Sequence, residues 1–302
     1  MRNFRTKFFY WLAGGFLLVI LIWFFGRGDN NQQEEDSGLY PVASFTDVHG
    51  LTVNVVDSSK LYIATHHGLY LLRNSSDLFR IGKAQDDYMG FSSHPTDPNI
   101  FYSSGHPSVG GNLGFQKSSD GGRTWQRVSN GAGGPVDFHA MAVSQADPNI
   151  IYGYYAGQLQ RSGDEGKNWE IIGKEAGKVI SLTTDPKEKN VVYASTLAGL
   201  LVSRDQGETW QALSDEFGGS PVTALVVNPK DNQEMFSYSQ KLGMAKSADG
   251  GMSWKKIDAD FAKDVVYYIA IDHQNPKILY AVTERLELYK TEDSGINWNK
   301  IR

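Results

Sequence analysis

The sequence predicts an all-β protein, a six-bladed β-propeller with Asp-containing turns, preceded by one N-terminal transmembrane helix. Three observations lead to this prediction. A short turn motif recurs at a nearly constant interval, two apolar β-branched segments precede each copy, and one long apolar run stands ahead of them all. A fixed period of roughly 20–50 residues is typical of propellers, solenoids and other repeat architectures.

The recurring motif is Ser/Thr-x-Asp-x-Gly-x-x-Trp, and its aspartates are spaced by 44, 41, 44 and 44 residues. Its five copies are Ser118/Asp120/Gly122/Trp125, Ser162/Asp164/Gly166/Trp169, Ser203/Asp205/Gly207/Trp210, Ser247/Asp249/Gly251/Trp254 and Thr291/Asp293/Gly295/Trp298. Short Asp and Ser side chains bind nearby backbone N–H groups, and Gly tolerates the positive φ of a tight turn. The Trp offers a large apolar face to a neighbouring strand. Each copy is therefore expected to be a structural hairpin turn and not a catalytic group.

The segments before each turn have the composition of β-strands, rich in β-branched and aromatic residues and bounded by Asp, Asn, Pro and Gly. The expected first strands lie in 51–57, 89–95, 141–148, 180–186, 223–229 and 269–276. The expected second strands lie in 60–65, 99–104, 150–155, 191–196, 234–239 and 278–283. A third strand leads into each turn and the Trp begins a fourth, which gives six units of four strands. The first unit has only a degenerate turn motif, with Asn74, Ser76 and Phe79 at the Asp, Gly and Trp positions.

The motif resembles the Asp-box, or BNR repeat, and the resemblance covers nearly everything after residue 45. Asp-box repeats occur in β-propellers such as sialidases, sortilin-type receptors and photosystem II assembly factors. The resemblance therefore implies a propeller. It does not select one activity, because one fold carries many functions.

The chain begins with a basic tail and one apolar run. Residues 8–25 read FFYWLAGGFLLVILIWFF, close to the roughly 20 residues that span a bilayer as a helix. Arg2, Arg5 and Lys7 precede the run, so the positive-inside rule keeps residues 1–7 in the cytoplasm and exports the rest. No A-x-A-like site follows, which favours an uncleaved signal anchor over a cleaved signal peptide. The expected location is the cell membrane, in a single pass, with the propeller outside the cytoplasm.

Residues 26–44 are expected to form a polar tether, and residues 45–302 the propeller. Residues 1–27 hold four of the 29 Lys and Arg and none of the 34 Asp and Glu, so residues 28–302 carry a formal charge of −9. An acidic domain lacks the electrostatic footprint of a nucleic-acid-binding protein. The chain has no cysteine, which excludes disulfides, thiolate metal sites and a cysteine nucleophile.

Propeller topology divides the loops between two rims. The starts of the first strands and the loops between second and third strands share one rim, and the Asp-box turns lie on the opposite rim. His94 and His273 follow first strands and are expected in turns on the Asp-box side. The other five of the seven histidines map to the first rim, which we call the histidine rim, within blades 1 to 3: His49, His66, His67, His106 and His139.

Imidazole and carboxylate groups that converge on a channel mouth can hold a transition metal such as zinc, copper or iron. The predicted metal ligands are His49, His66, His67, His106, His139 and Asp87. The same groups could act as general acid and base on a bound substrate. Alternatively, several of them only hydrogen-bond the backbones of their loops.

The rim segments DVHGL, THHGL, DYMGF, SGHP and DFHAM also resemble a narrower group, bacterial membrane-anchored Asp-box propellers that carry the label glycosylhydrolase. A glycosidase needs two carboxylates that flank the sugar bond. The candidate catalytic carboxylates are Asp86, Asp87, Asp137 and Glu284. The candidate ligand-binding residues beside them are Tyr88, Phe138, Tyr154, Tyr155, Tyr267 and Arg285.

Sialidase activity is not expected. Sialidases grip the substrate carboxylate with three arginines, and Arg285 is the only arginine that the pattern places near the rim. The segment 79–82 (FRIG) resembles the arginine-bearing FRIP motif but falls in the outermost strand of the first blade. The favoured function is a binding or assembly module whose rim takes a protein, a glycan or a metal ligand, with glycosyl hydrolase as the alternative.

Overall fold

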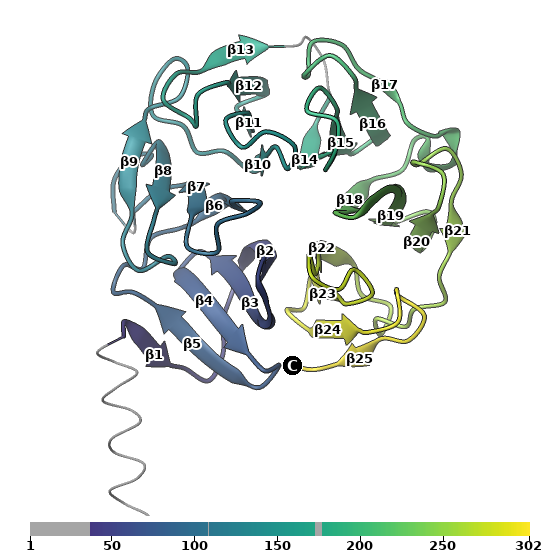
Figure 1. The fold of residues 1–302 in the computed structure, drawn as a ribbon, viewed down its shortest axis with the longest axis horizontal. Coiled ribbons are helices and arrows are strands. Elements are labelled where there is room, and N and C mark those ends of the chain that lie inside the picture. Colours follow the sequence, from purple (N-terminus) through teal and green to yellow (C-terminus); the bar gives the residue numbers. More distant parts are fainter. Residues whose placement is uncertain (1–36, 108, 173–176) are drawn as a thin grey trace, which may run out of the picture.

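The computed structural model of the chain describes residues 37–107, 109–172 and 177–302, and these form a ring of six antiparallel sheets (Figure 1). Five sheets have four strands and one has five. The predicted six-bladed β-propeller is therefore confirmed. The predicted cytoplasmic tail (1–7) and signal anchor (8–25) lie outside the described residues. Within the described ranges, no helix is long and apolar enough to cross a membrane.

Each blade is a continuous stretch of chain whose first strand lies nearest the ring axis (Figure 1). Blade 1 contains β2 (Val48–Asn54), β3 (Asp57–Thr65), β4 (Gly68–Arg73) and β5 (Asp77–Ile81). Blade 2 contains β6 (Met89–Ser93), β7 (Phe101–Ser104), β8 (Phe115–Ser118) and β9 (Gln126–Ser129). Blade 3 contains β10 (Ala140–Val143), β11 (Ile151–Tyr155), β12 (Gln158–Ser162) and β13 (Glu170–Ile172).

The second half of the ring repeats this plan. Blade 4 contains β14 (Val179–Thr184), β15 (Val192–Thr196), β16 (Gly199–Ser203) and β17 (Gln211–Ala212). Blade 5 contains β18 (Val222–Asn228), β19 (Asp231–Ser239), β20 (Gly243–Ser247) and β21 (Lys255–Lys256), and a short 3-10 helix, η1 (Asp215–Phe217), precedes it. Blade 6 contains β22 (Val266–Ile271), β23 (Leu279–Thr283), β24 (Leu288–Thr291) and β25 (Asn299–Lys300).

Blade 1 carries a fifth strand at its outer edge, β1 (Leu39–Pro41), which pairs antiparallel with β5. Leu39 is buried and lies opposite Ile81, so its apolar side chain covers the end of the blade. The stretch predicted as a tether, 26–44, therefore includes a strand that belongs to the propeller. The sequence also allows an extra ring-closing strand in 40–45, and β1 overlaps that segment but pairs within blade 1.

The Asp-box turns have the structural role that the sequence predicts. In blade 3 the Ser162 hydroxyl accepts a hydrogen bond from the N–H of Gly166 (2.8 Å) and donates to Asp164 Oδ1 (2.9 Å). Asp164 Oδ1 also accepts the N–H of Asn168 at 2.9 Å, and Trp169 Nε1 donates to the Gly166 carbonyl at 2.9 Å. The same pattern of Ser/Thr and Asp bonds recurs in the other four boxes.

Stability is expected to fall in acid partly through these boxes. Hydrogen bonds from the side chain and backbone of Thr209 lower the pKa of Asp205 to about 2, from a usual 3.8. A carboxyl with a lowered folded-state pKa stabilises the fold above its unfolded pKa and loses this contribution as pH falls toward the folded pKa. Urea midpoints of the wild type should therefore drop between about pH 4 and pH 2 more steeply than those of Asp205→Asn. Parallel curves would contradict this role.

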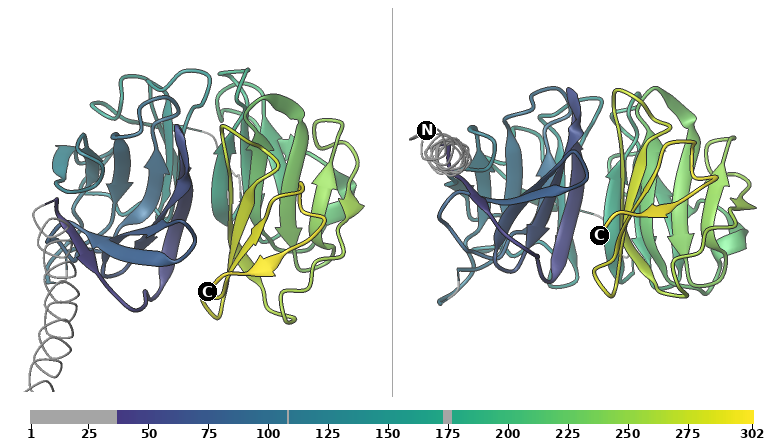
Figure 2. Two further views of the ribbon diagram at one scale, coloured as in Figure 1. Left: turned by 60° about the horizontal axis from the view of Figure 1, so that its bottom comes forward. Right: turned by 90° about the horizontal axis from the view of Figure 1, so that it is seen from below.

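The core is divided among the six junctions between blades, each of which holds one apolar cluster. The junction of blades 1 and 6 closes the ring, and it does so without exchanging a strand. Val53 of blade 1 and Val282 of blade 6 belong to the same buried cluster. The Gln274 side chain donates to the Val55 carbonyl at 2.8 Å, and the Arg302 guanidinium donates to carbonyls of blade 1 and its approach. The C-terminus lies beside blade 1 in two views (Figures 1 and 2).

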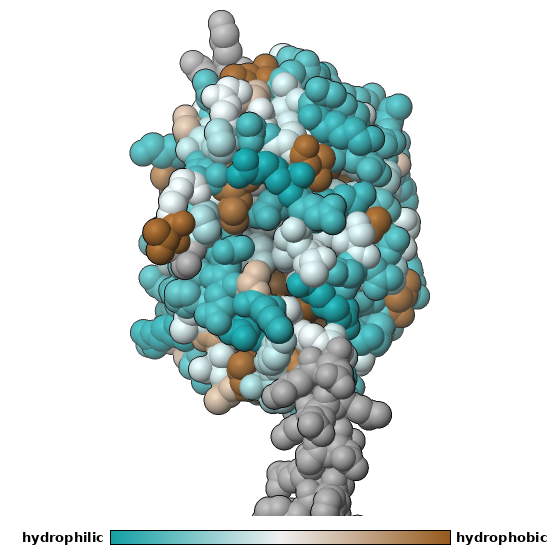
Figure 3. All heavy atoms as spheres, turned by 90° about the vertical axis from the view of Figure 1, so that its left-hand side faces the viewer, coloured by the Kyte–Doolittle hydropathy of each residue, from teal (hydrophilic) through white to brown (hydrophobic). Residues whose placement is uncertain are grey.

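One side of the outer wall of the ring is largely hydrophilic (Figure 3). On the side that carries β1 and β9, polar residues dominate and apolar residues stand in separate spots (Figure 3). Such scattered apolar exposure is ordinary for a water-soluble surface. This face therefore shows no large apolar patch.

Candidate functional site

The histidine rim is built by the chain segments that enter and leave the inner strands of blades 1 to 3. His49 is the extra residue of a β-bulge in β2, between the pairs Val48–Thr65 and Gly50–Ala64. Bulges re-aim side chains, and bulges at the same end of the first strands recur in blades 4, 5 and 6. The repeated architecture therefore sets the direction of His49.

The loop before β6 is bound to blades 1 and 2 at once. The Asp87 N–H donates to the His106 carbonyl at 3.0 Å, and the Tyr88 N–H donates to the Thr65 carbonyl at 3.1 Å. His66 directly follows Thr65 at the end of β3. These two backbone bonds bring His66 and His106 to Asp87.

Asp87 is the centre of the resulting cluster, and its side chain is only 3% exposed. Its Oδ2 lies 2.8 Å from His66 Nδ1 and 3.2 Å from His106 Nε2, and its Oδ1 lies 3.9 Å from His49 Nε2. The rings of His49 and His66 meet edge to face with centroids 4.1 Å apart. One potential ligand atom from each of His49, His66 and Asp87 falls within a mutual distance of 4.8 Å. We call His49, His66, His106 and Asp87 the Asp87 cluster.

Three buried polar atoms at this rim have no hydrogen-bond partner among the described residues: His49 Nε2, Asp87 Oδ1 and Asp137 Oδ1. Buried polar groups are nearly always paired, so unpaired ones call for a ligand or a catalytic role. His49 Nε2 and Asp87 Oδ1 face the same space at 3.9 Å. An ion between them would pair both atoms.

Electrostatics keeps His49 in the form that binds metals. Burial, and to a lesser extent the nearby His66, lower the pKa of His49 to about 4, so the ring is neutral at physiological pH. Burial raises the pKa of Asp87, while His66 and His106 oppose that increase. A neutral imidazole next to a largely buried carboxylate is a common metal-binding combination.

The other predicted ligands lie around the Asp87 cluster but not in it. The exposed His139 pairs with Asp137, with Nε2 and Oδ2 at 3.7 Å, and it contributes to the electrostatic environment of His49. His67 is exposed, its ring is 6.4 Å from that of His66, and no ion pair joins it to Asp87 among the described residues. Of the predicted ligands, His49, His66 and His106 thus lie beside Asp87, whereas His67 and His139 lie outside this group.

Two of the predicted ligand-binding aromatic residues are part of the core. Tyr88 is buried and stacks on Trp125, with centroids 4.8 Å apart, and the fully buried Phe138 packs against Trp169 at 4.9 Å. Their rings contact the Asp-box tryptophans of their own blades and cannot stack on a ligand at the rim.

The remaining candidates stay at the rim. The hydroxyl of Tyr154 donates to the Gly177 carbonyl, and that of Tyr155 accepts from Asn112. Asp86 is partly exposed, whereas Glu284 and Arg285 are exposed on blade 6. Within the described part of the chain, no hydrogen bond or ion pair joins the side chains of Asp86, Glu284 or Arg285 to the Asp87 cluster.

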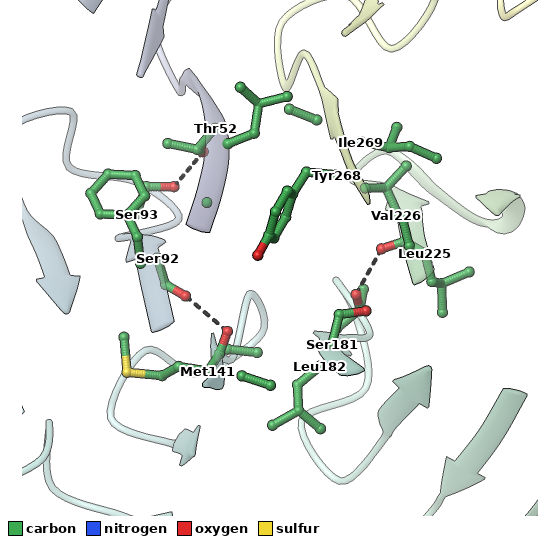
Figure 4. A pocket seen from close by; sticks show the side chains of 18 of the residues that line it. Thr52, Ser92, Ser93, Met141, Ser181, Leu182, Leu225, Val226, Tyr268 and Ile269 are labelled. Atoms are coloured by element: carbon green, nitrogen blue, oxygen red, sulfur yellow. Dashed lines mark hydrogen bonds between the residues drawn. The ribbon is translucent and has the colours of Figure 1, made fainter. Parts of the chain in front are cut away.

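Sequence reasoning missed Tyr268, although it noted the neighbouring Tyr267. Tyr268 lies in β22 and projects into the central channel, which is also lined by His49, His139 and His273 (Figure 4). Burial raises the pKa of Tyr268 to about 12, and the charge of Asp87 adds to the effect. From the sequence, a tyrosine in an inner strand is expected to pack in the core between blades. That Tyr268 faces the ring axis instead is seen only in the closed ring.

His94, by contrast, is a turn residue as predicted, since its Nδ1 accepts the N–H groups of Thr96 and Asp97.

Comparisons with known proteins agree with the fold. A family model described as BNR/Asp-box repeat matches residues 201–212, which include the third copy of the motif. No curated protein matches the chain. The structure is thus a six-bladed β-propeller, of which residues 201–212 match the Asp-box repeat.

Solved structures with the same architecture include two GH74 proteins. The GH74 enzyme from Niastella koreensis aligns with a TM-score of 0.64 and 17% identity over 87% of this chain and 46% of that one. The GH74 xyloglucanase from Xanthomonas campestris gives 0.59 and 20% with the same coverage, so the chain spans less than half of either protein. YCF48 from Cyanidioschyzon merolae gives 0.54 and 14% over 87% of this chain and 88% of that one. At these identities the likeness is one of fold alone.

Proposed function

We propose that this protein is a membrane-anchored, extracytoplasmic binding module that holds a transition-metal ion in the Asp87 cluster. The observation that supports it best is the pair of unpaired buried atoms, His49 Nε2 and Asp87 Oδ1, which face one another at 3.9 Å. His66 supplies a third ligand within the same 4.8 Å sphere, and His106 lies next to Asp87. Two or three imidazoles and one carboxylate suit zinc, iron or copper.

Metal held this way would keep a coordination position for a partner molecule. Three protein ligands leave at least one position open on a four-coordinate ion. His106 lies 3.2 Å from the Asp87 carboxylate and is not one of the three ligands, so it holds that carboxylate as an outer partner does in many metal sites. A protein, glycan or small molecule with a donor atom could then bind at the rim through the ion. Binding a partner through the metal ion requires no catalytic residue at the histidine rim.

Metal content should depend on His49 and not on its neighbour His67. Full-length wild type, purified and equilibrated with zinc, is expected to retain about one ion per chain, and His49→Ala should weaken affinity by about a hundredfold or more. His67→Ala is the matched control, since His67 is exposed and outside the cluster. Elemental analysis and calorimetric titration provide the measurement. Equal zinc content in all three proteins would reject the site.

The anchor is proposed from residues 8–25, whose apolar run and basic flank support a single-pass topology with the N-terminus in the cytoplasm. The double variant Leu18→Arg/Leu21→Arg should release the protein from membranes, because each central arginine costs about 2.5–3.5 kcal/mol on insertion. Carbonate extraction of cell membranes measures this. The tether variant Asn30→Arg/Gln32→Arg serves as control and should stay bound. Recovery of wild type in the soluble fraction would exclude the anchor.

Glycosyl hydrolase remains a second candidate, favoured by the two carboxylates at one rim. Burial raises the pKa of Asp87, and the nearby Asp137 adds to the increase, which suits a general acid. The GH74 enzymes, which share the propeller fold, make a polysaccharide substrate the first to try. Metal-free protein that cleaves a glycan panel, with activity lost in Asp87→Asn and in Asp137→Asn, would support this function over the metal site.

A further inference from the structure

The central channel of the propeller encloses a cavity of about 200 Å³. Its wall is formed mainly by the inner strands β2, β6, β10, β14, β18 and β22, so every blade contributes. His49 and His139 line this cavity on the histidine rim. The Asp87 cluster therefore shares His49 with the channel, and a ligand bound at the cluster can extend inward.

The wall of the cavity carries no Lys, Arg, Asp or Glu among the described residues that line it. Most of its hydroxyl groups are already paired within or between blades (Figure 4). Ser92 donates to the Met141 carbonyl at 3.1 Å, Thr183 to that of Leu225 at 2.8 Å, and Thr52 pairs with Ser93 at 2.9 Å. With these groups occupied, the channel presents mainly methyl, methylene and ring surfaces to whatever enters.

Two hydroxyl groups of the wall are not occupied in this way. Ser181 Oγ is buried and has no hydrogen-bond partner among the described residues. The Tyr268 hydroxyl points into the open middle of the channel, and no described residue hydrogen-bonds to it (Figure 4). The cavity therefore suits an apolar body with at most one or two polar atoms.

We propose that the channel receives the apolar body of a small carboxylate whose head group completes the coordination of the metal ion at the Asp87 cluster. This inference depends on the proposed metal site. A divalent ion with neutral histidines and the single charge of Asp87 keeps one net positive charge, which a carboxylate neutralises. Two other acidic groups lie nearby: Asp137 has His139 as its ion-pair partner at 3.7 Å, and the charge of Asp47 acts on His49. The size of the cavity limits the body to a short alkyl chain or one ring.

The test uses cobalt(II), whose visible absorption reports changes in coordination, bound to the full-length protein. Acetate and hexanoate are titrated in parallel, since they share a head group and differ in four methylenes. Each buried methylene strengthens binding by a factor of about four, so hexanoate should bind at least about tenfold more tightly than acetate. Ser181→Leu fills the channel without removing a hydrogen bond. In this variant cobalt and acetate affinity should be unchanged and the advantage of hexanoate lost.

The outcomes separate this inference from the proposed function. If cobalt binds but neither acetate nor hexanoate changes the absorption spectrum of the bound cobalt, the metal site is supported and the proposal of a carboxylate ligand is rejected. Equal affinity for acetate and hexanoate, or an advantage that persists in Ser181→Leu, overturns the role of the channel. Failure of the wild type to bind cobalt at all rejects both the metal site and what is built on it.

Discussion

Asp87→Asn is expected to abolish metal binding, with a loss of affinity of more than about a hundredfold. That loss exceeds the 10–100-fold that removal of an outer partner typically costs, because Asp87 is both a ligand and the group that orients His66 and His106. Asparagine keeps the size of the side chain but removes its charge. Calorimetric titration with zinc measures the effect, and a metal-induced rise in melting temperature should disappear with it.

Asp86→Asn is the control for this variant. Asp86 is the adjacent carboxylate, it is partly exposed, and it has no ion pair with the histidines of the cluster. It should bind zinc like the wild type. Metal-free Asp87→Asn is expected to be no less stable than the wild type, because burial of an ionised carboxylate opposes folding. Retained zinc affinity in Asp87→Asn would mean that the cluster is only a hydrogen-bonding network.

Gly166→Ala should destabilise the propeller by about 2–5 kcal/mol, the largest effect we expect from a single methyl group. Gly166 has φ near +82°, where an L side chain costs about 1–2 kcal/mol. A Cβ at this position would also lie 2.0 Å from the ring of Phe115, which is fully buried between blades 2 and 3. Overpacking of this kind typically adds about 1–3 kcal/mol. Urea unfolding followed by fluorescence measures the change.

Gly133→Ala separates the two contributions. Gly133 has φ near +85°, close to that of Gly166, but a Cβ there meets nothing within 4 Å. It should therefore show the backbone cost alone, about 1–2 kcal/mol. If the two variants were equally destabilised, close packing of the Asp-box against the neighbouring blade would not contribute. The comparison of the two variants therefore tests whether the Asp-box of blade 3 stabilises the fold through its contact with Phe115 of blade 2, in addition to forming a turn.

The sequence predicted the propeller well because the Asp-box is a local structure. The bonds among Ser162, Asp164 and Gly166 span only a few residues, so motif and geometry correspond directly. It also predicted which rim would collect the histidines, since strand order alone assigns each loop to a rim.

The details of the site depend on contacts that spacing does not encode. The bulge at His49 and the backbone bond from Asp87 to His106 decide which imidazoles converge, and neither has a sequence signature. The burial of Tyr88 beneath Trp125 follows from packing between the loop and the box. The position of Tyr268 on the ring axis follows from closure of the whole ring. The sequence predicts the order of the strands, but it does not predict the directions in which the side chains of His49, Tyr88 and Tyr268 point.

Because the ring closes by side-chain packing and every sheet comes from one unbroken segment, the order of blades along the chain is not fixed by the architecture. Arg302 bonds to the carbonyl of Ala43, so the C-terminal residue lies next to the segment between β1 and β2. A linker that runs along the outer edge of blade 1 could join Arg302 to Leu39 at the start of β1. New termini could then be placed between β13 and β14 with all six sheets intact. Circular permutants of this kind would move the proposed anchor segment to another blade while leaving the Asp87 cluster unaltered.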